Sequence, residues 1–401
     1  MKVLLAIDWH PLTIGGVQSH VRNLAQKLKE RGAEVAIVSK PLNNAKNKLC
    51  ESLDSKFLTC IPALFPIDTP LNLPDYDELK KVIEKFSPDV IHAHHAFTPL
   101  SLMSLLIAEE LGIKRVLTNH SITIGYNISN LWKKVANTFL LPYKLYISKA
   151  QVIISVSRAA DNFISNFADN IPRVIIPNGV DTDFYSPSRS SLSEDSMKIL
   201  FVGRLVFRKG AHVLVRAFKI VCKEVKDAKL EIVGRGYMTP LLVTLIERLG
   251  IRDKVFFYDL VNELTKKKLY DESALVALPS LYGESFCITA LEAMSMQKPV
   301  VASRCGGLEE IITDDYDGLL VEPNNHVQLA EKIVSLLTDK KLRNRISLNA
   351  RNTAIKRFSW NLIASKIYDI YEKLPDNKAI CIHGVNTAYG LTRTCQHVIP
   401  L

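Results

Sequence analysis

The 401-residue sequence has few cysteines and few long apolar runs. Its seven cysteines are an odd number and include no Cys-x-x-Cys pair, which predicts a reducing setting without a structural zinc site. The apolar stretch Val3–Ile7 is too short for the core of a signal peptide, and no run reaches the roughly 18 residues of a membrane span. We therefore expect a cytoplasmic protein.

Two common nucleotide-binding motifs are also missing. The sequence contains neither Gly-x4-Gly-Lys-Ser/Thr nor Gly-x-Gly-x-x-Gly followed by an acidic residue about 20 positions later. These absences count against P-loop hydrolases and ordinary dinucleotide enzymes. His92 and His94 share one face of an expected strand, but no acidic or Cys partner is near in sequence, so we expect no bound metal.

Acidic residues are too few to balance the basic ones. The sequence has 51 Lys and Arg against 41 Asp and Glu, and the net charge of +10 favours nucleic acid, an anionic membrane face or a phosphorylated substrate as partner. Between Glu110 and Asp161 there are seven basic residues and no acidic one. Because no RNA-binding motif is present, we expect no nucleic-acid partner.

Short runs rich in Val, Ile and Leu alternate with helix-like patterns, as in buried parallel strands joined by crossover helices. This alternation predicts an α/β fold of two Rossmann-like, doubly wound domains that face a cleft. A polar, Ser-rich linker separates them. The expected boundaries are 1–185 for the first domain, 197–357 for the second domain, 358–374 for a C-terminal helix, and 375–401 for a tail of unknown role.

Two loops at expected strand ends carry residues suited to a diphosphate. Gly15 and Gly16 precede a helix, whose free N–H groups would attract an anion, although a flexible turn is an equal alternative. Arg204 and Lys209 follow a strand and precede another helix. A guanidinium and an ammonium there suit a diphosphate, and a solvated basic loop is the alternative.

A third loop, in the stretch GESFCITALE, sets Glu284 and Glu292 eight positions apart. A glycosidase needs its two carboxyls about 5–5.5 Å apart to retain configuration, or about 6.5–9.5 Å apart to invert it. Eight helical steps would separate the backbones by ~12 Å, and the loop at Glu284 leaves the real distance open. We therefore interpret the two carboxylates as separate holding sites and not as an acid/base pair.

Several motifs together resemble a known family. The stretches GGVQSHVRNLAQKLKERGAEVAIVS, IIPNGVDTDFY, FVGRLVFRKG and GESFCITALEAMSMQKPVVAS, followed by GGLEEII and DGLLVEP, resemble a retaining, nucleotide-sugar-dependent glycosyltransferase of family 4 with the GT-B fold. The resemblance covers roughly residues 1–374. Within the family, HAHHAF and LGIKRVLTNHSI resemble the branch that includes the catalytic subunit of the GPI-anchor N-acetylglucosaminyltransferase and its prokaryotic relatives.

The resemblance implies that the first domain binds the acceptor, that the second binds the nucleotide sugar, and that the helix 358–374 crosses back to the first domain. It also implies roles for the residues already singled out. Arg204 and Lys209 would hold the donor diphosphate, Glu284 the hydroxyls of the transferred sugar, and Glu292 the ribose. Gly16 would lie beside the phosphates and His120 near the sugar at the reaction centre, so His120 and Glu284 are the candidate catalytic residues. The remaining donor contacts would come from the backbone of Ser285, Phe286, Cys287 and Ile288. At the position of Cys287 the family often has Gly.

These features predict an enzyme that moves a hexose or N-acetylhexosamine from a UDP- or GDP-sugar to a lipid-linked or phosphorylated acceptor at the cytoplasmic membrane face. The alternative is a soluble sugar acceptor, as in sucrose- or trehalose-type synthases. Enzymes of this fold generally need no metal, so no cofactor is expected beside the donor. UDP and GDP remain equal alternatives.

Residues 126–150 predict contact with an anionic membrane surface. They interleave aromatic and apolar residues with four lysines and no acidic residue, although a basic helix packed on the core is the alternative. We expect flotation with anionic liposomes at low salt, because each lysine near the lipid contributes about 1 kcal/mol. Changing Lys133, Lys134 and Lys144 to Glu should abolish this binding. Equal flotation with neutral liposomes, or unchanged binding of the triple variant, would contradict the prediction.

Overall fold

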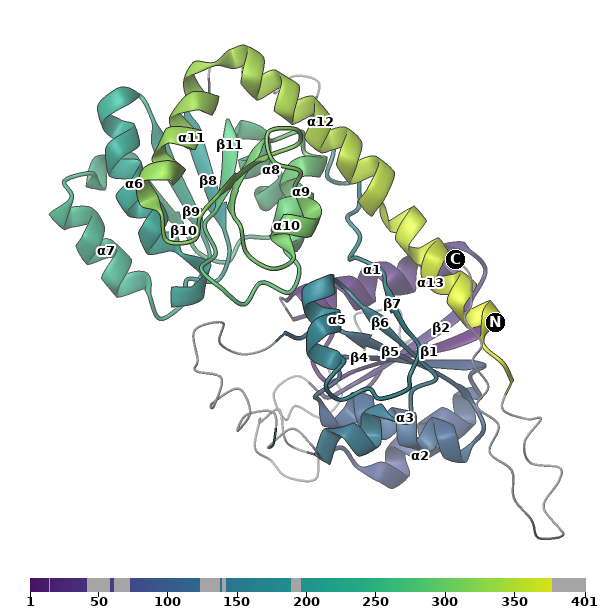
Figure 1. Ribbon diagram of the computed structural model, residues 1–401. Helices are drawn as coiled ribbons and strands as arrows, with labels where there is room; N and C mark the ends of the chain where they lie inside the picture. Colours follow the sequence, from purple (N-terminus) through teal and green to yellow (C-terminus); the bar gives the residue numbers. More distant parts are fainter. Residues whose placement is uncertain are drawn as a thin grey trace, which may run out of the picture.

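The computed structural model describes residues 1–13, 15–41, 58–60, 73–122, 138, 142–188 and 196–376. Within these residues the chain forms two parallel sheets with helices packed on them (Figure 1). We refer to the sheet β1–β7 with its helices as the first unit and to the sheet β8–β13 with its helices as the second unit. Most of the basic segment 126–150, and all but the first two residues of the tail 375–401, lie outside the described residues.

The first unit has its strands in the order β3-β2-β1-β4-β5-β6-β7. The strands are β1 (Lys2–Ile7), β2 (Glu34–Ser39), β3 (Leu58–Cys60), β4 (Val90–His94), β5 (Lys114–Asn119), β6 (Val152–Ser155) and β7 (Arg173–Ile175). The helices are α1 (Gly16–Glu30), α2 (Tyr76–Phe86), α3 (Pro99–Glu110) and α5 (Arg158–Ile164). The strand order reverses between β1 and β4, and ligands of doubly wound sheets bind at such a point.

The second unit repeats this plan with the order β10-β9-β8-β11-β12-β13. Its strands are β8 (Lys198–Val202), β9 (Lys229–Val233), β10 (Val255–Tyr258), β11 (Leu275–Leu278), β12 (Val300–Ser303) and β13 (Leu319–Val321). Its helices are α6 (Ala211–Glu224), α7 (Thr239–Arg248), α8 (Glu263–Glu272), α9 (Ile288–Ser295), α10 (Leu308–Ile311), α11 (His326–Thr338) and α12 (Lys340–Phe358). The reversal here lies between β8 and β11.

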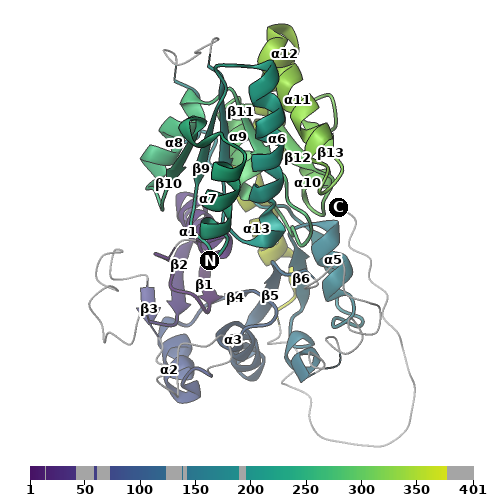
Figure 2. The same ribbon diagram turned by 90° about the vertical axis from the view of Figure 1, so that its left-hand side faces the viewer.

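The apolar runs form strands because both faces of each sheet are covered. In β1, Leu5 and Ile7 enter one core cluster, while Leu4 and Ala6 enter the cluster on the opposite face. Alternate residues of a strand point to opposite faces, so a strand buried on both faces must be apolar throughout. Figure 2 shows the second unit stacked on the first, with α2 and α3 on the side away from it.

The last described helix, α13 (Trp360–Lys373), crosses back to the first unit (Figure 1). Trp360, Ile367 and Tyr371 are buried in one cluster with Leu24 and Leu28 of α1. The kink between α12 and α13 is paired with the segment that joins the units. Its two hydrogen bonds run from Val180 N to Phe358 O at 2.8 Å and from Trp360 N to Val180 O at 3.1 Å.

Glu310 makes a further contact between the units. Its carboxylate oxygens accept hydrogen bonds from the backbone N–H of Arg158 at 2.8 and 3.0 Å, and Oε1 also accepts one from Ala159 at 3.4 Å. These N–H groups begin α5, where a negative charge is favourable because of the helix dipole. A side chain of the second unit therefore completes a helix of the first.

The cysteines differ in part from the expectation. Cys222, Cys287 and Cys305 are free thiols, whereas Cys60 is disulfide-bonded. The predicted reduced state therefore does not hold at Cys60, because spacing along the sequence does not reveal which cysteines meet in space. None of the helices in the described ranges combines the length and the apolar character that a membrane span requires.

Candidate active site

The candidate residues lie in loops at the carboxyl ends of parallel strands in both units. Two helix N-termini from different units meet there: a Cβ added at Gly16 of α1 would stand 3.5 Å from Cδ1 of Ile288 in α9. The strand ends and the residues that follow them are β1 with Gly15 and Gly16, β5 with His120, β8 with Arg204 and Lys209, and β11 with Glu284.

Helices α1, α6 and α9, which follow these loops, begin without a side-chain cap and without an acidic residue in the first turn. Helices α3, α7 and α13 begin in the same way, whereas α2, α5, α8, α11 and α12 are each capped by an Asp, Ser or Asn side chain. The first N–H groups of a helix need acceptors. Uncapped N-termini beside a cleft are therefore suited to an anionic ligand.

Lys209 and Glu284 form an ion pair at the centre of the second-unit loops. Nζ of Lys209 lies 2.5 Å from Oε2 of Glu284, and Oγ of Ser280 donates to the same oxygen at 3.0 Å. Glu284 is 5% exposed, and its Oε1 has no hydrogen-bond partner among the residues that the structure describes. Half of this carboxylate is therefore held by the protein, and the other half is left to accept from a ligand.

The loop that carries Glu284 is fixed by the glycines of the GGLEEII stretch. Gly307 N donates to Glu284 O at 2.9 Å. Gly306 has a φ of +53°, and a Cβ there would stand 2.2 Å from Glu284 O. Only glycine fits so close a backbone approach at positive φ. These two glycines therefore position the Glu284 loop, a role that sequence reasoning did not assign.

Arg204 lies beside this pair, exposed and without a hydrogen-bond partner in the described part of the chain. Its pKa is lowered, first by partial burial and then by the neighbouring cation of Arg208. Arg208 donates through Nη1 to Gly283 O at 2.8 Å. Three cations thus surround one carboxylate, so the loops carry an excess of positive charge that an anion would offset.

Glu292 is held by a separate set of partners. Lys266 Nζ donates to its Oε1 at 2.9 Å, and Tyr270 OH donates to its Oε2 at 2.9 Å. Burial, and then the charge of Glu292, raise the pKa of Tyr185 and of Tyr270, so both phenols stay protonated. Glu284 and Glu292 therefore share no hydrogen-bond partner among the residues that the structure describes.

Glu292 also lines a pocket of about 450 Å³ between the units. The second unit contributes Ile288 and Glu263, and the first contributes residues of α1 such as Ser19 and Arg22. Sequence reasoning missed Lys266, Tyr270 and the α1 side chains. For Lys266 and Tyr270, the sequence indicates only that a helix follows a strand end at this point. It does not reveal which residues of that helix, α8, face α9.

Cys287 begins α9 with a φ of −100°, a region open to any residue. Its side chain is 4% exposed, and burial, followed by the charge of Glu284, raises its pKa to about 12. The departure from Gly at this position therefore strains nothing. Phe286 is buried beside Cys287 in the same core cluster, so the backbone of the Ser285–Ile288 stretch is firmly placed.

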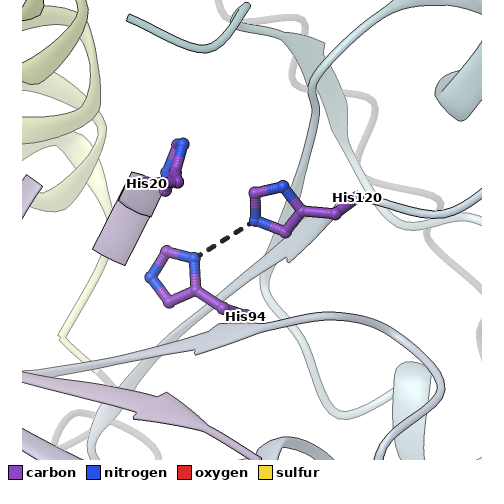
Figure 3. Close-up of side chains that lie close together, drawn as sticks. All are labelled: His20, His94 and His120. Carbon is purple, nitrogen blue, oxygen red and sulfur yellow. Dashed lines mark hydrogen bonds between the residues drawn. The ribbon is translucent and has the colours of Figure 1, made fainter. Parts of the chain in front are cut away.

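His120 lies in a group with His20 of α1 and His94 of β4 (Figure 3). His94 Nδ1 and His120 Nε2 are 3.5 Å apart, and the rings of His20 and His120 have centroids 4.9 Å apart. Burial lowers the pKa of His20 to about 4 and the pKa values of His94 and His120 well below 6.5. All three imidazoles are therefore neutral at pH 7.

His92 shares the strand face with His94, as predicted, and their ring centroids are 4.2 Å apart. Both nitrogens of His92 have close partners, Tyr371 OH at 2.6 Å and Thr118 Oγ1 at 2.6 Å. His92 therefore has a structural role in tying α13 to the sheet. Sequence reasoning did not place His20 in this group, because it comes from a distant helix.

Comparisons with known proteins agree with this architecture. Residues 14–184 match the family model Glycosyltransferase Family 4, and residues 186–353 match Glycosyl transferases group 1. An uncharacterised glycosyltransferase of Methanocaldococcus jannaschii is 29% identical over 385 residues, which is 94% of this chain and 99% of the relative. A phosphatidylinositol N-acetylglucosaminyltransferase subunit of Arabidopsis thaliana is 25% identical over 379 residues, 93% of this chain and 82% of the relative.

Among solved structures, Anabaena HepE in complex with UDP-glucose has a TM-score of 0.74 at 22% identity, covering 93% of this chain and 100% of HepE. This likeness confirms the predicted fold. The two family models together span most of the chain, and the relatives include the branch that the histidine motifs resemble. The chain therefore belongs to the family 4 glycosyltransferases and has the GT-B fold.

Proposed function

We propose that the protein transfers a hexose or N-acetylhexosamine from a UDP- or GDP-sugar to a lipid-linked or phosphorylated acceptor and retains the anomeric configuration. One observation carries the proposal: the cations of Arg204, Arg208 and Lys209 and the uncapped N-termini of α1, α6 and α9 lie around Glu284. A glycosyl nucleotide diphosphate has a dianionic bridge beside a polyhydroxylated ring. The bridge requires cations and N–H donors, and the hydroxyls of the ring require an acceptor such as the carboxylate of Glu284.

The diphosphate would take the place nearest the cations. Arg204 would bind phosphate oxygens through its guanidinium, which has no protein acceptor among the described residues. Lys209 would contact the leaving oxygens while keeping its pair with Glu284. The N–H groups of α1 would reach the same phosphates from the first unit, because Gly15 and Gly16 leave the backbone accessible.

The sugar and the nucleoside would occupy opposite sides of the diphosphate. Glu284 would accept from hydroxyls of the sugar through Oε1, and Glu292 would accept from the ribose beside the pocket between the units. HepE, which shares this fold, is known in complex with UDP-glucose, and this supports a nucleotide-sugar donor. His120 would meet the sugar from the first unit as a neutral imidazole.

In the proposed reaction, the acceptor hydroxyl attacks the anomeric carbon on the face from which the nucleotide leaves. The bond from carbon to phosphate oxygen breaks, and the hydroxyl proton passes to an oxygen of the departing phosphate. The cations stabilise the charge that develops on the nucleotide diphosphate. Neither glutamate acts as the acid or base partner of the other, since their hydrogen-bond partners are separate.

Two observations bear on the acceptor. The Arabidopsis relative is named for phosphatidylinositol, a lipid with a phosphorylated polyol head group. The excess of basic residues between Glu110 and Asp161 favours the same kind of acceptor, because it would hold the first unit against anionic lipid. These observations support a peripheral position at the inner membrane face and a lipid-linked acceptor over a soluble one.

Thermal unfolding with a panel of UDP- and GDP-sugars tests the donor. The correct donor at 100 times its dissociation constant should stabilise the chain by ~2.7 kcal/mol, and its partner nucleotide should compete with it. Transfer assays with phosphatidylinositol vesicles and with soluble sugar phosphates then test the acceptor. Stabilisation by no nucleotide sugar would refute the function, whereas transfer to soluble sugars alone would establish the sucrose-type alternative.

Changing Arg204 or Lys209 to Ala should weaken the binding of UDP and of GDP to the same extent, because both cations are assigned to the diphosphate. A charge-assisted hydrogen bond contributes roughly 1.5–3 kcal/mol, which corresponds to about one to two decades of affinity. Calorimetry would measure this loss. Arg216→Ala is the matched control, since this exposed cation lies on α6 away from the loops. Unchanged nucleotide affinity in both site variants would sink the assignment.

Glu284→Ala and Glu292→Ala should have different effects. The first should depress kcat with every sugar donor and leave binding of free UDP or GDP nearly intact. The second should mainly raise the KM for the donor, because it removes the ribose acceptor. Steady-state kinetics and calorimetry separate the two, with Glu→Gln variants to keep the shape of each side chain. Equal loss of free-nucleotide binding, or hydrolysis of simple glycosides by the wild type, would contradict this division of roles.

A further inference from the structure

The group of His20, His94 and His120 has features that the proposed transfer reaction does not require. One ligand atom from each imidazole lies within 4.8 Å of the others. The three side chains come from α1, from the end of β4 and from the loop after β5, and Figure 3 shows their rings around a common space. His20 and His94 are 2% and 0% exposed.

His20 is oriented as a metal-binding histidine would be. Its Nδ1 lies 2.7 Å from Oδ1 of Asn178, an oxygen that can only accept, so Nδ1 carries the proton. The lone pair is then on Nε2, which is buried and has no hydrogen-bond partner among the described residues. Fixing one ring nitrogen through a protein acceptor is how metal-ligating histidines are usually held.

His94 also has an unsatisfied nitrogen. Its Nε2 is buried without a partner in the described ranges, and its Nδ1 has only a 3.5 Å contact with His120 Nε2, at the limit of a hydrogen bond. A neutral imidazole has one N–H and one lone pair. Whichever nitrogen of His94 carries the proton, its lone pair receives at most one weak contact. Buried polar atoms of this kind usually have partners.

We propose that His20, His94 and His120 bind a divalent transition metal ion of the zinc class. Three imidazoles are a known zinc ligand set, with the fourth position left to water or a small ligand. Two nitrogens at ~2.0–2.1 Å from one tetrahedral zinc lie about 3.4 Å apart. The ligand atoms, which all lie within 4.8 Å of one another, therefore need to draw together by at most about 1.4 Å. Nitrogen-only ligands exclude calcium and magnesium, which prefer oxygen.

The proposed site departs from the expectation that the chain binds no metal. That expectation rested on the absence of an acidic or Cys partner near His92 and His94 in sequence. The structure replaces the missing partner with His20, whose position depends on how α1 packs against the end of the sheet.

Metal binding would also affect catalysis, an inference that rests on the proposed function. His120 is the residue assigned to the donor sugar, and an imidazole that binds zinc has no lone pair left for a sugar hydroxyl. Zinc and the nucleotide sugar should therefore compete, and zinc should act as an inhibitor that raises the apparent KM of the donor.

The test begins with the full chain stripped of metal by a chelator and titrated with Zn²⁺ by calorimetry and with Co²⁺ by visible absorption. We expect one ion per chain and the intense d–d bands of tetrahedral Co²⁺. His20→Ala and His94→Ala should each lower the affinity for Zn²⁺ at least tenfold. Asn178→Ala should lower the affinity for Zn²⁺ roughly 10- to 100-fold. Asn178→Asp should bind Zn²⁺ as the wild type does, because it keeps an acceptor for Nδ1–H of His20.

Two control variants test whether Zn²⁺ binds to histidines or cysteines outside this site. His212→Ala removes a histidine of α6 whose Nδ1 has no partner in the described ranges, and it should leave Zn²⁺ affinity unchanged. The variant Cys381→Ser, His383→Ala, Cys395→Ser and His397→Ala removes the ligand types of the tail and should also bind normally. Circular dichroism checks that each variant is folded.

Equal Zn²⁺ affinity in the wild type and in folded Asn178→Ala and His94→Ala, or loss of binding in the tail variant, would overturn the site. The titrations contain no donor, so their result does not depend on whether the chain is the proposed transferase. Zinc that binds through these histidines but leaves the donor KM unchanged would overturn the competition.

Discussion

The ion pair between Lys209 and Glu284 is the contact on which the rest of the site depends. A buried carboxylate needs a cation and hydrogen bonds, because desolvation without them costs more than the fold can spare. Lys209 and Ser280 meet this need at one oxygen only. The pair therefore ties the loops after β8 and β11 to each other through one oxygen of Glu284.

The first unit joins this arrangement through packing and through hydrogen bonds. Gly16 and Ile288 bring the starts of α1 and α9 together, and the carboxylate of Glu310 accepts hydrogen bonds from the first N–H groups of α5. The site is therefore assembled from two units, each of which supplies helix N-termini. Any change in how the units sit would alter the distance between the N-termini of α1 and α9.

Much of the fold follows from the sequence, because strands buried on both faces must be apolar throughout and such runs are easy to find. The placement of Glu284 in a loop and of Glu292 in the helix that follows was also predictable from the residue pattern. The partners of these carboxylates were not. Lys266 and Tyr270 reach Glu292 from α8 through tertiary packing, and His20 reaches His94 from α1. No spacing along the chain encodes such meetings.

The crossing of α13 has a consequence for synthesis on the ribosome. Trp360, Ile363 and Ile367 complete the core of the first unit, yet they are made only after the whole second unit. At 5–20 residues per second, the roughly 185 residues between β7 and α13 take about 10–40 s to emerge. During that time the part of the first unit that α13 later covers, which includes part of α1, lacks this cover, so the nascent protein offers chaperones an apolar surface that the finished one has buried.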